Sequence, residues 1–175
     1  YDFEGKFQLM SLIALAIAAL PLSQSAAADI ARAEQTRLNA CIQQSETDAE
    51  AAFEESLRWL GEGARPAARY CNAMALLGLG NYKEAAVRLE ELASAPDAGG
   101  LGDRAVYLAQ AGNAWLVAGY SDAAIVSFSD ALKISPEDPQ ILTDRGAAYL
   151  GTDQIDEAIE DLDAALAITP NSVDA

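Results

Sequence analysis

Among the side chains that could do chemistry, carboxylates are abundant, two cysteines are present, and histidine is absent. Without an imidazole there is no histidine-based acid–base catalysis, no Ser–His or Cys–His nucleophile pair, and no histidine metal ligand. Gly99-Gly100-Leu101-Gly102 has no following lysine and no preceding strand, which a phosphate-binding loop requires. We therefore predict that the protein is not an enzyme and uses no cofactor or small-molecule substrate.

The charge balance is strongly acidic, with 27 acidic and 11 basic residues and a formal net charge of −16. This argues against binding to nucleic acid or to an anionic membrane surface, because both need basic patches. A C-terminal acidic cluster raises the question of calcium; its members are Asp153, Asp156, Glu157, Glu160, Asp161 and Asp163. The cluster lacks the turning glycine of a calcium loop, so we predict no metal site. Solubility is the simplest interpretation of the charge, and a basic partner is the sharper one.

The N-terminal segment has the composition of an export signal. The apolar run Leu9–Leu22 is followed by Ser23-Gln24-Ser25 and by Ala26-Ala27-Ala28. This order is typical of a secretory signal peptide that is cleaved after Ala28, and the run is too short to span a bilayer comfortably. We predict that residues 1–28 are a signal peptide or leader and that the protein is periplasmic. An uncleaved membrane anchor and a buried helix of the repeat array are the open alternatives.

Over its last two thirds the chain repeats with a period of 34 residues, and an earlier, less regular unit lies 39 residues before the next. Seven positions recur at the distance of 34 residues: Leu108 and Leu142, Gly112 and Gly146, Trp115 and Tyr149, Ala124 and Ala158, Phe128 and Leu162, Ala131 and Ala165, and Pro136 and Pro170. Steps of three and four residues within each unit indicate two amphipathic helices, and the prolines end the second one. A fixed period of this size is typical of stacked two-helix units.

This pattern resembles the tetratricopeptide repeat. The resemblance implies an all-α, right-handed solenoid of about four antiparallel helix pairs. We expect this domain to cover residues 29–175, with units at about 30–63, 66–99, 105–138 and 139–172. Arg145 stands where the family usually has leucine, and we expect its aliphatic stem to pack while its charge stays at the surface.

Three helix starts are predicted from capping residues. Asp138 precedes Pro139, a favoured first helical residue, and Asp153 is the expected cap of the last helix. Asn81 with Glu84 has the spacing of a capping box. The surplus residues 96–102 between the second and third units are expected to form a lengthened loop.

The two cysteines lie on helices that would be neighbours in such a stack. An even cysteine count in an oxidising compartment favours pairing, whereas buried free thiols are the alternative. The segments Ala40–Ile42 and Arg69–Asn72 also look like exported bacterial tetratricopeptide proteins that carry a cysteine pair. We predict a disulfide between Cys41 and Cys71.

The resemblance implies a non-catalytic protein–protein interaction module or scaffold. A peptide or partner helix would bind in a concave groove lined by the first helix of each unit. The residues expected there are Tyr70, Met74, Leu77, Val106, Ala109, Asn113, Leu116, Val117, Thr143 and Ala147. Most are apolar, and the lysine- and asparagine-rich clamp that some relatives use for a carboxylate is missing. Ordinary packing between repeats is the alternative for these ten positions.

A structural role is the competing hypothesis, in which copies stack end to end through the C-terminal repeat. The final helix carries Ile155, Ile159, Leu162, Leu166 and Ile168. Some of these should face the position of a following helix, which would leave an uncovered apolar surface. Pro170-Asn171-Ser172 repeats the pattern of Pro136-Glu137-Asp138, so we expect either that the natural chain continues or that another copy covers this face.

Overall fold

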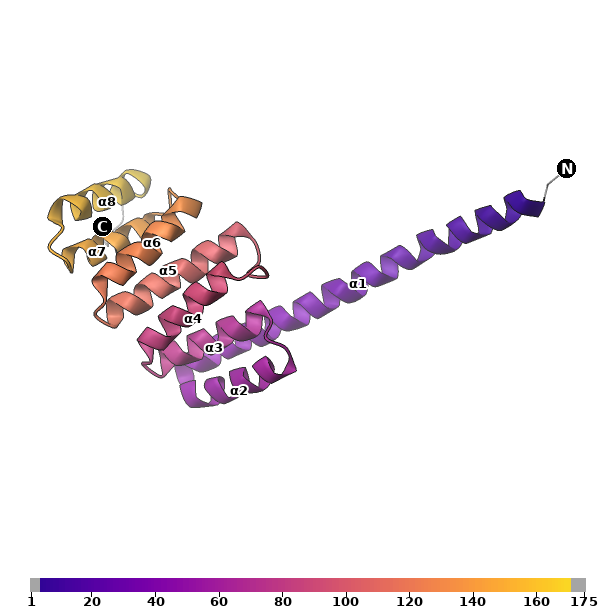
Figure 1. The fold of residues 1–175 in the computed structure, drawn as a ribbon, viewed down its shortest axis with the longest axis horizontal. Coiled ribbons are helices and arrows are strands. Elements are labelled where there is room, and N and C mark those ends of the chain that lie inside the picture. The colour runs from indigo at the N-terminus through magenta and orange to yellow at the C-terminus, as the bar shows by residue number, and fades with distance from the viewer. Residues whose placement is uncertain (1–3, 171–175) are drawn as a thin grey trace. The chain divides into compact units, whose positions relative to one another are not determined.

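The computed structural model describes the backbone of residues 4–170 and the side chains of residues 26–170. Within this range every regular element is a helix, and there are eight of them (Figure 1). Their bounds are α1 Glu4–Thr47, α2 Ala49–Glu62, α3 Pro66–Gly78, α4 Tyr82–Ser94, α5 Leu101–Val117, α6 Ser121–Ile134, α7 Pro139–Leu150 and α8 Ile155–Ile168. The predicted all-α class is confirmed.

The chain divides into two compact units, Tyr1–Asn39 and Ala40–Ala175. The described part of the first unit belongs to helix α1, which begins at Glu4, well before residue 29, where the repeat domain was expected to start. The ion pair Arg32–Asp29 and the hydrogen bond from Gln35 to Asn39 follow helical spacing. The side chains of Leu9–Leu22 lie outside the described residues. No helix in the described part of the chain has the length and apolarity to cross a membrane.

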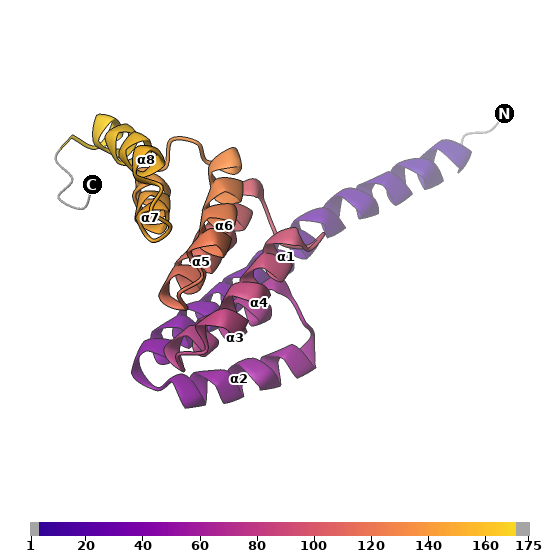
Figure 2. The same ribbon diagram turned by 60° about the vertical axis from the view of Figure 1, so that its left-hand side comes forward.

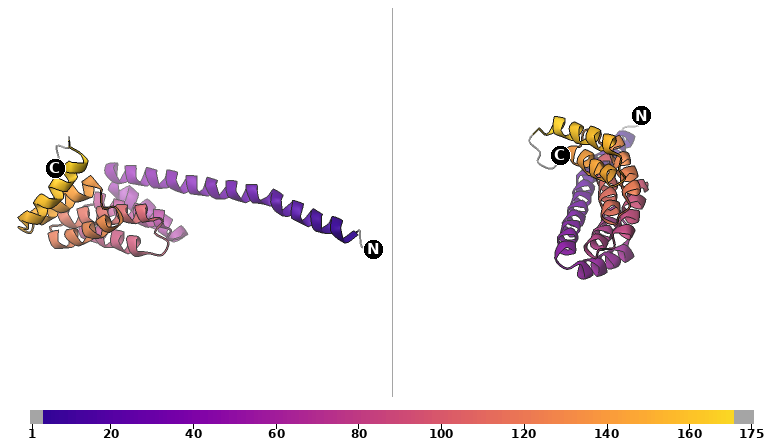
Figure 3. Two further views of the ribbon diagram at one scale, coloured as in Figure 1. Left: turned by 90° about the horizontal axis from the view of Figure 1, so that it is seen from above. Right: turned by 90° about the vertical axis from the view of Figure 1, so that its left-hand side faces the viewer.

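The second unit is a stack of helix pairs. Each helix from α2 to α8 packs against the next one along the chain, and α5 also contacts α7. The views in Figures 2 and 3 agree on this side-by-side order. Close approach between the first two pairs involves Gly78 of α3, where a Cβ atom would collide with the backbone carbonyl of Ser45 in the last turns of α1. The predicted solenoid of helix pairs is confirmed.

Three tight turns join the helices of the later pairs with the same geometry. Gly80, Gly119 and Asp153 have φ angles of 75°, 82° and 59° respectively, all in the left-handed region. The following amide donates back over five residues in each turn, as from Tyr120 to the carbonyl of Trp115 at 2.9 Å. This pattern is the Schellman motif, which ends a helix with a left-handed residue, usually glycine.

The helix starts confirm one capping prediction and contradict two. The Asp138 carboxylate accepts from the amides of Gln140 and Ile141 at 3.0 and 3.2 Å, and Pro139 opens α7. Asn81 precedes α4 without a side-chain hydrogen bond to it, so the capping box with Glu84 is wrong. Asp153 is also no cap, because it occupies the left-handed turn position before Gln154.

Two side chains of α5 hold the glycine-rich connection between α4 and α5. Helix α5 begins at Leu101, so the loop is shorter than the predicted 96–102. The Arg104 guanidinium donates to the carbonyls of Ala93 and Ala95 at 2.6 and 2.8 Å, at the end of α4, where helix carbonyls lack partners within the helix. The Asp103 carboxylate accepts from the Gly100 amide at 2.8 Å, which is the N3 half of a capping box, since glycine has no side chain to return a hydrogen bond.

The core combines alanine with a few large side chains. Alanines such as Ala85, Ala124 and Ala158 are fully buried, so neighbouring backbones approach closely. Trp59, Leu89 and Phe128 are fully buried as well and fill the remaining space. A Cβ atom on Gly112 would lie 2.6–2.8 Å from the Phe128 ring, which explains why this position is glycine.

A side-chain hydrogen bond crosses each boundary between successive helix pairs. The Asn72 amide on α3 donates to the Ser56 hydroxyl on α2 at 2.9 Å. The indole N–H of Trp115 on α5 donates to Glu90 on α4 at 2.8 Å. At the third boundary, Arg145 on α7 donates to the Ser129 hydroxyl on α6 at 3.1 Å. Because these groups are partly or fully buried, each contact satisfies atoms that would be costly to leave unpaired.

Candidate functional site: the face of α3, α5 and α7

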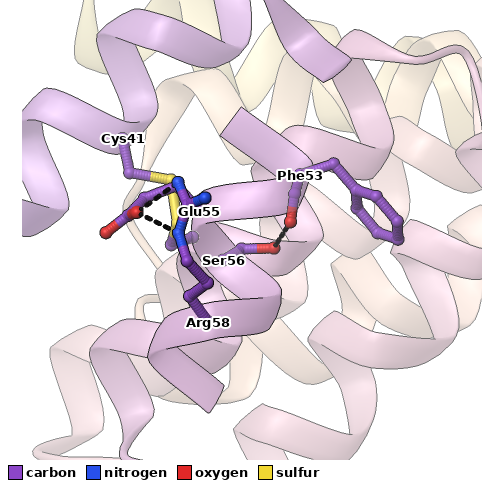
Figure 4. Close-up of polar contacts among 6 residues, drawn as sticks. Cys41, Phe53, Glu55, Ser56 and Arg58 are labelled. Carbon is purple, nitrogen blue, oxygen red and sulfur yellow. Dashed lines mark hydrogen bonds and ion pairs between the residues drawn. A yellow bond between two sulfur atoms is a disulfide. The ribbon is translucent and has the colours of Figure 1, made fainter. Parts of the chain in front are cut away.

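The two cysteines form the predicted disulfide. Cys41 in the last turns of α1 is bonded to Cys71 in the middle of α3, with their Cα atoms 5.8 Å apart. Figure 4 shows the sulfur–sulfur bond at Cys41. The same view shows two contacts within α2, namely the Glu55–Arg58 ion pair and the hydrogen bond from the Ser56 hydroxyl to the Phe53 carbonyl. Both cysteines are buried, so the disulfide is part of the packed interior, where it links α1 to α3.

The ten predicted groove residues all lie on α3, α5 and α7, the first helix of each pair. None of them is fully buried. Val106, Val117 and Ala147 are exposed, and the other seven are half-buried. Leu77, Ala109 and Leu116 contribute to the core with part of their surface. As a set, these positions therefore contribute to packing between repeats and also present accessible surface. Packing was one interpretation of the sequence, and a binding groove was the other.

Two aromatic rings meet where α3 and α5 pack together. Tyr70 and Tyr107 have ring centroids 5.0 Å apart and are tilted by 47°. Burial, and then the neighbouring Tyr107, raise the pKa of Tyr70 above its ordinary value. Burial and then Asp103 raise the pKa of Tyr107, while Arg69 lowers it less. Both phenols are therefore protonated at neutral pH. Tyr70 was predicted to lie on this face, and Tyr107 was not.

A carboxylate held by two amides lies where α5 meets α7. Asp144 accepts from Gln140 Nε2 at 2.9 Å through one oxygen and from Asn113 Nδ2 at 3.3 Å through the other. Asn113 was predicted on this face, but Asp144 was not. Helical spacing could have found it, because Asp144 lies four residues after Gln140 and three before Ala147.

Arg145 does not place its charge at the surface, which corrects the sequence prediction. Its guanidinium makes two hydrogen bonds of 2.7 Å to Asp161 on α8, and that carboxylate side chain is only 8% exposed. The hydrogen bond with Asp161 is the main cause that raises the pKa of Arg145. The arginine replaces leucine here because α8 supplies a buried acidic partner, so a polar pair stands in for an apolar contact.

Two hollows lie next to α4. The larger one, of about 680 Å³, is lined by α4 and the turn between α5 and α6. The smaller one, of about 420 Å³, lies between α2 and α4 over part of α3. Glu84, Arg88 and Glu91 border both of them, and Arg88 is paired with the two glutamates. Neither hollow includes any of the ten predicted groove residues.

The acidic residues of the last helix are distributed along its exposed surface. Asp156, Glu157, Glu160 and Asp163 are exposed, whereas Asp161 is buried against Arg145. Among the residues that the structure describes, no group of three or more acidic or cysteine side chains could hold a metal ion.

Comparison with known proteins gave one family match and one similar solved structure. Residues 116–175 match the family model of the tetratricopeptide repeat. This segment carries tetratricopeptide-repeat sequence. A solved structure, the crystal structure of MamA protein, matches with a TM-score of 0.62 and 18% identity, over 79% of this chain and 76% of that one. This second likeness concerns the fold. A comparison with curated protein sequences gave no match.

The tetratricopeptide repeats and this fold support a protein-interaction scaffold as the general class of function. Such arrays are typically non-catalytic, since their stacked helices offer an extended surface in place of a catalytic pocket. The matched segment extends over α6, α7 and α8, so it includes Asp144 and Ala147 of the face described above.

Proposed function

We propose that this protein is a non-catalytic scaffold that binds a peptide segment or helix of a partner protein along the face of α3, α5 and α7. The observation that supports it most is the row of ten side chains on three successive first helices, each with accessible surface. A surface of this kind offers apolar contact area together with a few polar groups that orient a bound chain.

A matched pair of variants tests the face. Val117 on α5 and Val126 on α6 are exposed to 63% and 60%, so tryptophan at either position meets a similar surface environment. Proteins captured from the cell envelope by the full chain should be lost with Val117→Trp and retained with Val126→Trp. Equal capture by both variants, or loss with Val126→Trp alone, would place the binding surface elsewhere, for example at the hollows beside α4.

The proposed setting is the periplasm. Support comes from the order of the apolar run Leu9–Leu22, the polar spacer and the alanine-rich site, and from the Cys41–Cys71 disulfide, which persists in oxidising compartments. Mass spectrometry of the protein from its own cells should detect a mature chain that starts at Asp29. A chain that retains Leu9–Leu22 would instead indicate an uncleaved anchor.

End-to-end self-association is a second candidate, and the exposed side chains of α8 favour it. Ile155, Ile159 and Ile168 are exposed to 50%, 51% and 43%. Asn171 and Ser172, which carried the expectation of a further helix, lie outside the described residues. If copies stack through α8, the sedimentation coefficient of the 29–175 segment should rise with concentration, and Ile159→Glu should abolish the rise. A concentration-independent monomer would exclude this role.

A further inference from the structure

The Asp144 carboxylate is held in a way that leaves its charge available to a partner. Both of its oxygens accept hydrogen bonds from neutral amides, Gln140 of the same helix and Asn113 of α5. Amides fix the position of a carboxylate but do not neutralise it. The side chain is half-buried, and its electrostatic interactions are therefore screened less than those of a fully exposed acid.

No lysine or arginine of the described residues forms an ion pair with Asp144. The arginines of α5 and α7 are engaged in other contacts. Arg145 is bound in a bidentate pair to Asp161, and Arg104 donates to the carbonyls at the end of α4. The negative charge at this point of the face is therefore uncompensated within the stack, in a chain whose formal net charge is already −16.

Apolar surface adjoins this carboxylate on both helices. Ala147 lies three residues after Asp144 on α7, and Val117 lies four residues after Asn113 on α5, so each pair shares one helix face. Both apolar side chains are exposed. The site therefore combines one oriented carboxylate with adjacent aliphatic area, which fits the ammonium or guanidinium head of a long side chain and its aliphatic stem.

We infer that the cluster of Asn113, Gln140 and Asp144 binds a lysine or arginine side chain of the partner segment, with aliphatic residues of that segment on Val117 and Ala147. This inference rests on the proposed function, because it assigns a chemical class to the occupant of the same face. Asp144 makes the ion pair, while Asn113 and Gln140 are positioning residues. A carboxylate-bearing or acidic segment would be rejected by like-charge repulsion.

Selection from a library of random short peptides displayed on phage tests the inference without a known partner. The immobilised full chain is compared with Asp144→Asn, which keeps the side-chain shape, and with Asp163→Asn, which removes an equal charge from the exposed face of α8. Equal melting temperatures of the three proteins confirm that all are folded. Peptides selected on the parent chain and on Asp163→Asn should be enriched in lysine and arginine, and Asp144→Asn should lose the enrichment.

The affinity of the most enriched peptide gives the quantitative readout. Its dissociation constant should rise about tenfold with Asp144→Asn, as for a lost charge-assisted hydrogen bond, and should stay unchanged with Asp163→Asn. If Asp144→Asn selects and binds the same basic peptides while Val117→Trp blocks them, the cation site is wrong and the proposed binding face stands. If no peptide is selected, or if Val117→Trp has no effect on those that are, both proposals fail.

Discussion

The ion pair between Arg145 and Asp161 makes a strong prediction about stability. Arg145→Leu introduces the residue that the family usually has at this position. It also leaves the Asp161 carboxylate, which is only 8% exposed, without its ion-pair partner. We expect a loss of about 2–4 kcal/mol in the free energy of unfolding, since an unpaired buried charge is costly. The double variant Arg145→Leu/Asp161→Ala should recover most of this loss in urea titrations. A single variant as stable as the parent would show that the pair contributes little.

The raised pKa of Tyr70 predicts a loss of folding stability at high pH. Its pKa is raised in the folded protein, so the folded state holds the phenolic proton more tightly than the unfolded chain does. The contribution to stability is complete below about pH 10, the ordinary tyrosine value, and is lost as the pH rises through the higher folded pKa. Between pH 9 and 11.5, the melting temperature of the parent should therefore fall more steeply than that of Tyr70→Phe. Parallel curves would contradict a raised pKa.

Close helix packing makes two glycines respond oppositely to the same change. A Cβ atom on Gly112 would press into the buried Phe128 ring, whereas one on Gly61 of α2 would meet nothing within 4 Å. Gly112→Ala should lower the free energy of unfolding by about 1–3 kcal/mol through overpacking. Gly61→Ala should be neutral or raise it by up to about 1 kcal/mol, because alanine favours helix.

Thermal unfolding of both glycine variants measures this contrast. Gly146 is the intermediate case, since its Cβ atom would lie 3.1 Å from Leu162 Cγ, and leucine at this position should still destabilise the protein. If Gly112→Ala proved as stable as the parent, the close approach of α5 and α6 would not be the reason for glycine.

Helix content and order were predictable from the sequence because periodicity is a property of each segment alone. The start of α7 was also predictable, since Asp138 followed by Pro139 defines a cap and a first turn locally. Asp153 marks the limit of prediction from local sequence, because aspartate suits both a helix cap and a left-handed turn. The packing of α7 against α8 decides between the two. The Arg145–Asp161 pair and the Asn113–Asp144 contact required knowing which helices meet.

The disulfide should affect the array unevenly. It closes a segment of 30 residues that contains α2, and removing it is expected to cost about 2–4 kcal/mol. In a linear stack each pair contacts only its neighbours, so the effect should fade with distance. Hydrogen exchange after reduction should therefore become faster in α2 and α3 and stay unchanged in α8. The variant Cys41→Ser/Cys71→Ser serves as control, because reductant should not alter its exchange further. Uniformly faster exchange along the chain would indicate a single cooperative unit instead.

The polar contacts at the three pair boundaries have a consequence for how such a chain could have grown or could be re-engineered. Each boundary uses different partners: Asn72 with Ser56, Trp115 with Glu90, and Arg145 with Ser129. If the α5–α6 pair were duplicated in tandem, the second copy of Trp115 would face Ser129, which aligns with Glu90 when Ala124 is aligned with Ala85. The shorter hydroxyl side chain would replace the carboxylate that accepts the indole N–H. The pairs are therefore not interchangeable modules, and lengthening or shuffling this array would require new boundary residues at every junction.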